Sequence, residues 1–511
     1  MFRRVARRQG VARSLCAATA VALALTLAAC GSQLDPETVS KANGGDTTGA
    51  QGGVAGSDTG VVDDGTTGGT GGTGDLGTSG TTGSTGDTGT GGSTGTTGGS
   101  TGGSGGGDSG GSGGGSGGDE GTGDNAAGGG GKGASCDGFK NQTGVTDDTI
   151  TIGNSSDISG PVPGLFESSQ DAMKAYVAYF NRDSDICGRK LKLNLYDSRT
   201  DAAADQQAYA KACDEVFAMV GSMSAFDSGG AATAQNCGIP DIRSAAVTRE
   251  RNACATCFGA QSTQTGEFEN AVPDFVKKYY ADSADNAGFL YINAGAAAQN
   301  AVVQKNAMEK RGLKFSVFQG IDISEFNYAP YVQQLKDEGV EVVFWIGAYQ
   351  QSVRLRQAMQ QQGYTPKLYL RDPTDYHPDY IETGGDAVEG TVVFLNFVPF
   401  EEANSNKELQ LYMSWLQQVK PGATPTFFGL FSWSAARLFV EQSLALGGKL
   451  SRPALVSAVK GVNNWTANGM HSPQTVGSKH ISECWRFVKL TGGKWVPVGG
   501  TKYSCTGITT A

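Results

Sequence analysis

The stretch Thr149-Ile150-Thr151-Ile152-Gly153 opens a regular alternation of short apolar runs and amphipathic segments. Its β-branched residues favour a strand, and the segment that follows, residues 166–180, carries apolar side chains at helical spacing. The pattern repeats through a second strand at residues 190–196, a second helix at 201–216 and a third strand at 217–221. Repeated alternation of strand and helix is typical of parallel sheets that have helices on both faces.

The alternation continues toward the C-terminus and is interrupted near residue 262. We expect the further elements to be a helix at 228–236, a strand from 239, a helix at 265–280, a strand at 288–292, a helix at 297–311, a strand at 314–319, a helix at 328–337, a strand at 340–346, a helix at 350–362, a strand at 367–370 and helices at 406–419 and 428–446. The sequence therefore predicts an α/β protein with two doubly wound parallel-sheet lobes and a ligand cleft between them. Lobe 1 would comprise about 145–262 and 396–475, and lobe 2 about 263–395 and 476–511.

Residues 1–135 differ in composition from the rest of the chain. Five arginines precede an apolar run that ends in Leu27-Ala28-Ala29-Cys30. This ending resembles the lipobox of bacterial lipoproteins, which implies a signal peptide over 1–30, lipidation of Cys30 and anchoring at the outer face of the cytoplasmic membrane. Residues 31–135 hold 43 glycines and no Phe, Trp or Tyr, so we expect a disordered Gly/Thr/Ser-rich tether there.

Charge and composition exclude several classes of function. The formal net charge is -10, there are only three histidines, and residues 136–511 contain no basic run. These features argue against a nucleic-acid partner and against a His-rich metal site. The sequence has no Gly-x-Ser-x-Gly motif and no phosphate-binding Walker loop. We therefore expect that the chain is not an enzyme and has no cofactor. We also expect it to be a monomer.

Eight cysteines remain when Cys16 and Cys30 are set aside, and an even number in an exported protein indicates disulfides. From their places relative to the expected strands and helices, we predict the pairs Cys136–Cys187, Cys213–Cys237 and Cys484–Cys505. The remaining Cys254 and Cys257 lie in an expected loop and could form a small-loop disulfide, half of a zinc site or a redox centre. The first alternative is favoured because the sequence has no second Cys-x-x-Cys and no His pair to complete a zinc site.

Four phrases of the sequence, taken in order, resemble a known family. They are Ile152-Gly153-Asn154-Ser155-Ser156-Asp157-Ile158-Ser159-Gly160-Pro161, Val220-Gly221-Ser222-Met223-Ser224, Ile239-Pro240 and Leu355-Arg356-Gln357-Ala358. Their order and spacing resemble the type I periplasmic-binding-protein fold, in the group of leucine/isoleucine/valine-binding proteins that supply ABC importers. The resemblance implies a small-molecule ligand, an ABC permease as partner and closure about a hinge where the chain crosses between lobes near residues 262, 395 and 475.

The resemblance also points to a ligand-binding loop after the third strand. In amino-acid-binding members this loop offers a hydroxyl and helix-start N–H groups to the ligand carboxylate. Here it begins with Ser224, and the matching hydroxyl position falls on Ala225 or Phe226. Asp227 follows, and we expect its charge to repel a carboxylate placed there.

Three further segments correspond to ligand-binding positions of the family. After the fourth strand, these positions fall on Ala246 and on Thr248, or on Val247 in the other register. Tyr349 matches a ligand-contacting tyrosine, and Asp372 lies near the position of the acidic group that binds the ligand amine.

The substitutions at these positions predict a pocket that is wider and less charged than is usual in the family. The position of a second aromatic residue falls on Ala297, in keeping with this prediction. We therefore expect a solute-binding lipoprotein that captures an amide, a small aromatic or another apolar metabolite, or a branched-chain amino acid. The alternative is an extracellular sensor that presents its ligand-bound form to a membrane receptor instead of an importer.

Overall fold

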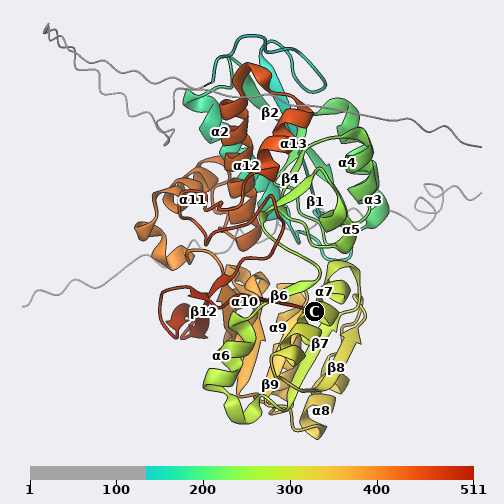
Figure 1. Cartoon of the computed structure of the whole chain (residues 1–511). Helices are drawn as coiled ribbons and strands as arrows, with labels where there is room; N and C mark the ends of the chain where they lie inside the picture. The colour runs from blue at the N-terminus through green and yellow to red at the C-terminus, as the bar shows by residue number, and fades with distance from the viewer. Residues whose placement is uncertain (1–133) are drawn as a thin grey trace, which may run out of the picture. The chain divides into compact units, whose positions relative to one another are not determined.

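A computed structural model describes residues 134–511 of the chain (Figure 1). The predicted signal peptide, the predicted lipidation of Cys30 and all but the end of the predicted tether lie outside the described residues. Within residues 134–511, no helix is both long enough and apolar enough to cross a membrane.

The first sheet is built from residues before the first crossing. Its five strands pair in parallel in the order β2-β1-β3-β4-β5. The strands are β1 (Thr149–Ser156), β2 (Lys190–Asp197), β3 (Ala218–Val220), β4 (Asp241–Ala245) and β5 (Cys257–Gln261). Every residue of β3, β4 and β5 is buried, as in other parallel strands that have helices on both faces. We call this sheet and its helices lobe 1.

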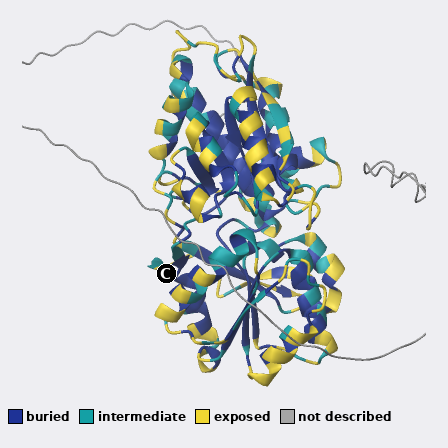
Figure 2. Ribbon diagram, turned by 90° about the vertical axis from the view of Figure 1, so that its right-hand side faces the viewer, coloured by how far each residue is buried: buried dark blue, intermediate teal, exposed yellow. Residues whose placement is uncertain are grey.

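Helices cover both faces of the lobe 1 sheet, and the buried strands lie between them (Figure 2). The helices are α2 (Glu167–Asp183), α3 (Ala202–Glu215), α4 (Ala231–Cys237), α5 (Arg249–Ala253), α11 (Lys407–Val419), α12 (Phe427–Leu446) and α13 (Arg452–Lys460). Successive strand residues point to opposite faces, so Val220 packs in the core with α2 and α12, whereas Met219 packs with α3 and α4. Residues 407–460, which follow most strands of the second sheet and precede its last two, thus return to complete lobe 1.

The second sheet forms lobe 2 and has the order β13-β12-β11-β10-β9-β7-β8. The strands are β7 (Ala287–Ile292), β8 (Phe315–Ile321), β9 (Val342–Ile346), β10 (Leu368–Arg371), β11 (Val392–Leu395), β12 (Cys484–Thr491) and β13 (Lys494–Val498). The pairing is parallel from β8 to β11, and the last two strands add an antiparallel hairpin. The helices of this lobe are α6 (Ala271–Tyr279), α7 (Gly295–Lys310), α8 (Ala329–Asp337), α9 (Tyr349–Gln361) and α10 (Pro378–Gly384).

Two local expectations were wrong. Cys257, expected in a loop, begins the buried edge strand β5. The helix expected over residues 265–280 starts only at Ala271, because β6 (Glu267–Glu269) precedes it and pairs with β15 (Ile508–Thr510). Strand β6 depends on a partner more than 200 residues away, so its own sequence does not reveal it.

The chain crosses between the lobes three times, and hydrogen bonds join the crossings. The Ser262 N–H donates to Oε1 of Gln474 at 3.0 Å, which connects the first crossing to the third. The Ser472 N–H donates to the carbonyl oxygen of Asn396 at 2.7 Å, which connects the third to the second. The crossings therefore form one hydrogen-bonded unit beside the cleft.

The structure confirms the predicted cysteine pairs. The disulfides are Cys136–Cys187, Cys213–Cys237, Cys254–Cys257 and Cys484–Cys505. Cys254 and Cys257 close a loop between α5 and β5, in agreement with the favoured alternative for this motif. Cys484 lies opposite Cys505 of the short strand β14 (Ser504–Cys505), which pairs with β12.

Candidate ligand-binding cleft

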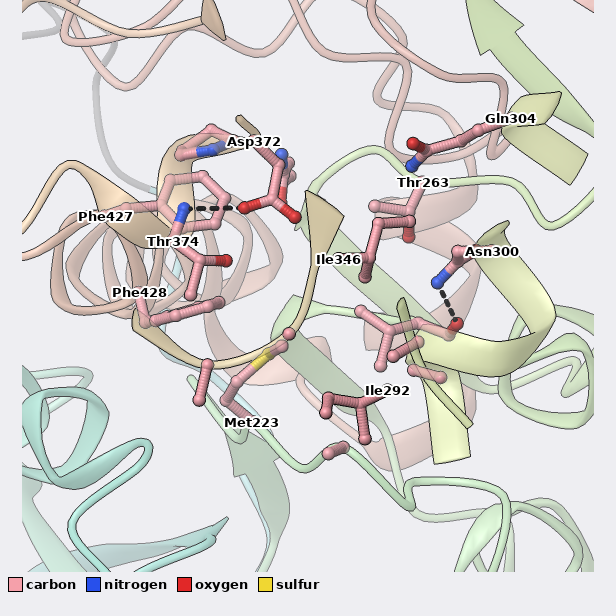
Figure 3. A pocket seen from close by; sticks show the side chains of 18 of the residues that line it. Met223, Thr263, Ile292, Asn300, Gln304, Ile346, Asp372, Thr374, Phe427 and Phe428 are labelled. Carbon is pink, nitrogen blue, oxygen red and sulfur yellow. Dashed lines mark hydrogen bonds between the residues drawn. The ribbon is translucent and has the colours of Figure 1, made fainter. Parts of the chain in front are cut away.

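A cavity of about 250 Å³ lies between the two lobes, beside the crossings (Figure 3). The residues that line it from lobe 1 are Val162, Leu165, Phe166, Thr200, Met223, Ala225, Phe226, Val247, Gln261, Phe427 and Phe428. Those from the crossings and from lobe 2 include Ser262–Thr265, Glu267–Glu269, Ile292, Ala294, Ala296, Ala297, Asn300, Gln304, Ile323, Ile346–Ala348, Gln351, Asp372–Thr374, Phe394, Ile481 and Trp485. Both lobes and the crossings therefore contribute to one site.

Much of the cavity wall is apolar and aromatic. Phe428 lies at the start of α12, with its ring centroid 4.5 Å from that of Phe166 and 4.8 Å from that of Phe427. Figure 3 shows Phe427 and Phe428 on one side of the cavity and the amide side chains of Asn300 and Gln304 on the other. Such a site combines a large apolar contact area with a few polar groups that can orient a ligand.

The backbone donors of the loop after β3 already have acceptors within the protein. The Ala225 N–H donates to Oδ2 of Asp157 at 2.8 Å, and the Phe226 N–H donates to Oγ of Ser224 at 3.2 Å. Asp157 is fully buried and also accepts from the Thr200 N–H at 3.0 Å. The N–H groups that would bind a ligand carboxylate in this loop are therefore occupied.

The loop after β4 is occupied in the same way. The N–H groups of Val247 and Thr248 donate to the two carboxylate oxygens of Asp227 at 2.9 and 3.1 Å, and the Thr248 hydroxyl donates to Oδ1 at 2.5 Å. The Thr248 oxygen also caps α5 by accepting from the Arg251 N–H at 3.4 Å. The expectation that Asp227 repels a ligand was wrong, because its carboxylate is fully buried and holds these two loops together.

Behind these loops, Asp227 belongs to a buried charge network. Arg251 binds Asp205 at 2.7 Å and Asp241 at 2.9 Å, and Arg243 lies 3.6 Å from Asp227 and 3.4 Å from Asp241. None of these five side chains is exposed. Each buried charge has an opposite charge beside it, which offsets the cost of removing it from water. We call these five residues the lobe 1 charge network.

The lobes are in direct contact at the start of α7. The Ala296 N–H donates to the carbonyl oxygen of Ala225 across the cleft at 2.9 Å, and Nδ2 of Asn300 donates to the carbonyl oxygen of Val247 at 3.2 Å. Gly295 has φ +50°, and a Cβ at this position would lie 2.5 Å from the Ala225 oxygen. Only glycine permits so close an approach of the two backbones.

Three carboxyl groups line the cavity, and none of its lining residues is Lys, Arg or His. Glu267 has partners, because His480 binds it at 2.7 Å and the Ile481 N–H donates to it at 3.2 Å. Asp372 accepts from the Thr374 N–H at 2.9 Å, as Figure 3 shows, and lies 3.6 Å from Nη2 of Arg371.

Glu269 differs from the other two carboxyl groups. Its residue is 4% exposed, and among residues 134–511 it has neither an ion-pair partner nor a hydrogen bond to another side chain. Burial raises the pKa of Glu269 to about 8, its own backbone N–H opposes the increase, and Asp372 adds to it. A carboxyl group inside the cleft thus lacks the counter-ion that would hold it ionised.

The structure places only some of the predicted ligand-binding residues at the cavity. Phe226 and Asp372 line it. Ser224, Ala246 and Thr248 are buried and lie outside the set of lining residues. The two hydroxyl groups are used within the protein, Ser224 as an acceptor for its own loop and Thr248 as a helix cap.

Tyr349 faces a neighbouring polar cavity of about 450 Å³. Its ring stacks on His377 with centroids 4.4 Å apart, and its hydroxyl donates to Asp379 at 3.2 Å. Leu165, Thr374 and Phe428, among other residues, line both cavities. Tyr349 is therefore near the apolar cavity but not part of its wall.

Sequence reasoning missed the residues that reach the cleft from the crossings and from the C-terminal hairpin. Glu269, Phe394, Ile481 and Trp485 all line the cavity. The paired phenylalanines at 427–428, at the start of an expected helix, were the one local signal that could have indicated an aromatic wall.

Comparison with known proteins gives one family across most of the chain. The family model described as "Periplasmic binding protein" matches residues 149–494. A "Leu/Ile/Val-binding protein homolog 1" from Brucella suis is 24% identical over 143 residues, which are 28% of this chain and 37% of that protein. The chain thus spans little more than a third of the length of the curated relatives that it matches.

Solved structures share the fold over a longer region. A leucine-binding protein from Thermotoga maritima superposes with a TM-score of 0.60 at 14% identity and covers 71% of this chain and 99% of its own. A fatty acid ABC transporter substrate-binding protein from Thermomonospora curvata also has a TM-score of 0.60, at 20% identity, and covers 72% and 96%. At these identities the likeness concerns the fold alone.

Proposed function

Because the chain belongs to the periplasmic binding protein family, we propose that it is the extracytoplasmic solute-binding protein of an ABC importer. Proteins of this family bind solutes and do not transform them, so the chain is a solute-binding protein and not an enzyme. In the proposal, the protein captures a small apolar or amide-bearing metabolite by hinge closure and then docks on a membrane permease.

The observation that carries this proposal is the cavity formed jointly by both lobes and the crossings. A ligand in this cavity contacts both lobes only when they are together, so it favours the closed state by its differential contacts. The hydrogen bond between Ala296 and Ala225 adds a direct lobe contact to that state. The connected crossings would serve as the hinge.

The apolar walls support a ligand with an apolar body, and the amide side chains support one with a polar group. Gln261, Gln264, Asn300 and Gln304 contribute amides to a surface that also contains Phe226 and other aromatic residues. The relatives described above are named for leucine and for fatty acids, both of which have an apolar body.

A thermal-shift screen of the full chain, kept oxidised, tests ligand capture. The library contains amino acids, amides, amines, short acids, aromatics and sugars. A ligand at one hundred times its dissociation constant stabilises the folded state by about 2.7 kcal/mol, a shift of several degrees. A compound that shifts the melting temperature and also compacts the protein in small-angle scattering supports the proposal. A ligand that binds without compaction contradicts hinge closure.

Gly295 allows a sharper test of closure. In Gly295→Ala, the new Cβ would meet the Ala225 carbonyl oxygen, so we expect the closed state to be disfavoured and the affinity for a screened ligand to fall at least tenfold. Gly312→Ala is the matched control, since Gly312 also has a positive φ (+97°) but has no atom within 4 Å of the added Cβ. Equal affinity of the two variants would contradict the proposed closure.

Membrane anchoring through Cys30 is a separate part of the proposal. Replacement Cys30→Ser is expected to move the protein from the membrane fraction to the soluble fraction of a host that processes lipoproteins. Cys16→Ser, within the predicted signal peptide, is the control and should leave the protein in the membrane fraction. Membrane retention of Cys30→Ser would contradict the lipid anchor.

A further inference from the structure

We propose that the cleft selects an apolar organic ammonium compound that has no free carboxylate, with Glu269 as its counter-ion. This inference rests on the proposed solute-binding function and names the chemical class of the ligand. It is carried by a buried carboxyl group that has no ion-pair partner among residues 134–511 and by backbone donors that are already occupied.

Glu269 is buried at the wall of the cavity. It lies at the end of β6, on the first crossing, and lines the cavity while only 4% exposed. A buried carboxylate without a partner is costly, and proteins pair such groups or protonate them. Among the cavity-lining residues there is no Lys, Arg or His that could pair with it. Glu269 is therefore neutral in the empty cleft, and only a ligand can supply the cation that would hold it ionised.

The remainder of the wall suits a cation with an apolar body. Asp372 provides a second carboxyl group at the same cavity, close enough to influence the ionisation of Glu269. Phe268, Phe394 and Trp485 place aromatic rings around the same space, and aromatic faces attract desolvated cations. A neutral ligand would leave Glu269 without a counter-charge, whereas Asp372 lies 3.6 Å from Nη2 of Arg371.

The same cavity disfavours anions. The N–H groups of Ala225 and Phe226 donate to Asp157 and Ser224, and those of Val247 and Thr248 donate to Asp227. The Ala296 N–H, at the start of α7, donates across the cleft to Ala225. A ligand carboxylate would thus lack these backbone donors and would share the cavity with three carboxyl groups, which excludes free amino acids and fatty acids as preferred ligands.

Isothermal titration of the full chain with four probes of one shape tests the inference. The probes are 3-methylbutylamine, leucine (the same body with a carboxylate on the amine-bearing carbon), 4-methylpentanoate and 4-methylpentanamide. We expect the amine to bind at least tenfold more tightly than each of the other three. Tighter binding of leucine or of 4-methylpentanoate overturns the ammonium inference but leaves the proposed function in place.

The variant Glu269→Gln tests whether the charge of Glu269, and not the shape of the cavity, governs amine binding. It should weaken amine binding at least tenfold and leave the binding of 4-methylpentanamide within twofold. Glu382→Gln is the control, because Glu382 is exposed on α10 and has no ion pair among the described residues. Unchanged amine affinity in Glu269→Gln overturns the inference, as does the absence of amine binding to the unmodified chain. The proposed function would be contradicted only if the thermal-shift screen also found no ligand.

Discussion

Lobe 1 and the cleft both bury acidic side chains, but those of the lobe 1 charge network are paired with cations and Glu269 of the cleft is not. In the lobe 1 charge network, Arg251 binds Asp205 at 2.7 Å and Asp241 at 2.9 Å, with every side chain fully buried. In the cleft, Glu269 is almost as deeply buried and has no ion-pair partner among residues 134–511. The comparison teaches that a buried charge alone does not mark a binding site. A buried carboxyl group that faces a cavity and has no ion-pair partner does mark one, because the cation that would pair with it can come only from another molecule.

The largest expected effect on stability comes from breaking the lobe 1 charge network. Arg251→Met removes the cation that binds Asp205 and Asp241, and we expect a loss of about 3–5 kcal/mol in the free energy of unfolding. Urea denaturation measures this loss. Arg249→Met, at an exposed position two residues away, is the control and should stay within about 0.5 kcal/mol of the unmodified protein. A loss below about 1 kcal/mol in Arg251→Met would show that the network is not a structural unit.

The second effect is a pH dependence of folding stability that comes from Glu269 in the cleft. Because burial raises the pKa of Glu269 from 4.5 to about 8, the folded state holds a proton that the unfolded state has released between these values. Folded-state stability is therefore lost as the pH rises through this window, by up to about 1.4 kcal/mol per pH unit.

Glu269→Gln cannot ionise, so it should lack this loss. The difference in free energy of unfolding between Glu269→Gln and the unmodified protein should grow in favour of the variant from about pH 5 to pH 8. Denaturant titrations at several pH values measure it. A constant difference across the window would mean that Glu269 is already ionised or already has a partner.

The smallest effect distinguishes two carboxyl groups of one strand. Glu267 binds His480, which is largely exposed, and the Ile481 N–H, so Glu267→Gln is expected to cost no more than about 1 kcal/mol. The pH dependence assigned to Glu269 should persist in this variant. Loss of that dependence in Glu267→Gln would show that Glu267, and not Glu269, is the group that titrates.

Much of the fold could be predicted from the sequence because it depends on local periodicity. The run at residues 149–153 and its successors form the parallel strands, and the cysteine pairs follow from the ends of these elements. Strand β6 could not be predicted, because it exists by pairing with Ile508–Thr510 at the other end of the domain. The same long-range pairing places Glu269 in the cleft.

The site was less predictable than the fold. The resemblance to the leucine/isoleucine/valine-binding proteins pointed to Phe226 and Asp372, which line the cavity, and also to Thr248, whose hydroxyl binds Asp227 instead. Whether a hydroxyl or an N–H is available to a ligand depends on its partners inside the protein. Neighbours such as Asp157, which is 68 residues from Ala225 in the sequence, are visible only in the folded structure.

A crystal structure of the protein grown with 3-methylbutylamine tests the central claim most directly. We predict closed lobes, with the alkyl group against the aromatic wall and the ammonium nitrogen about 2.7–2.9 Å from a carboxylate oxygen of Glu269. An amine bound with its nitrogen away from Glu269, or a cleft that admits leucine with its carboxylate against the loops after β3 and β4, would contradict the account.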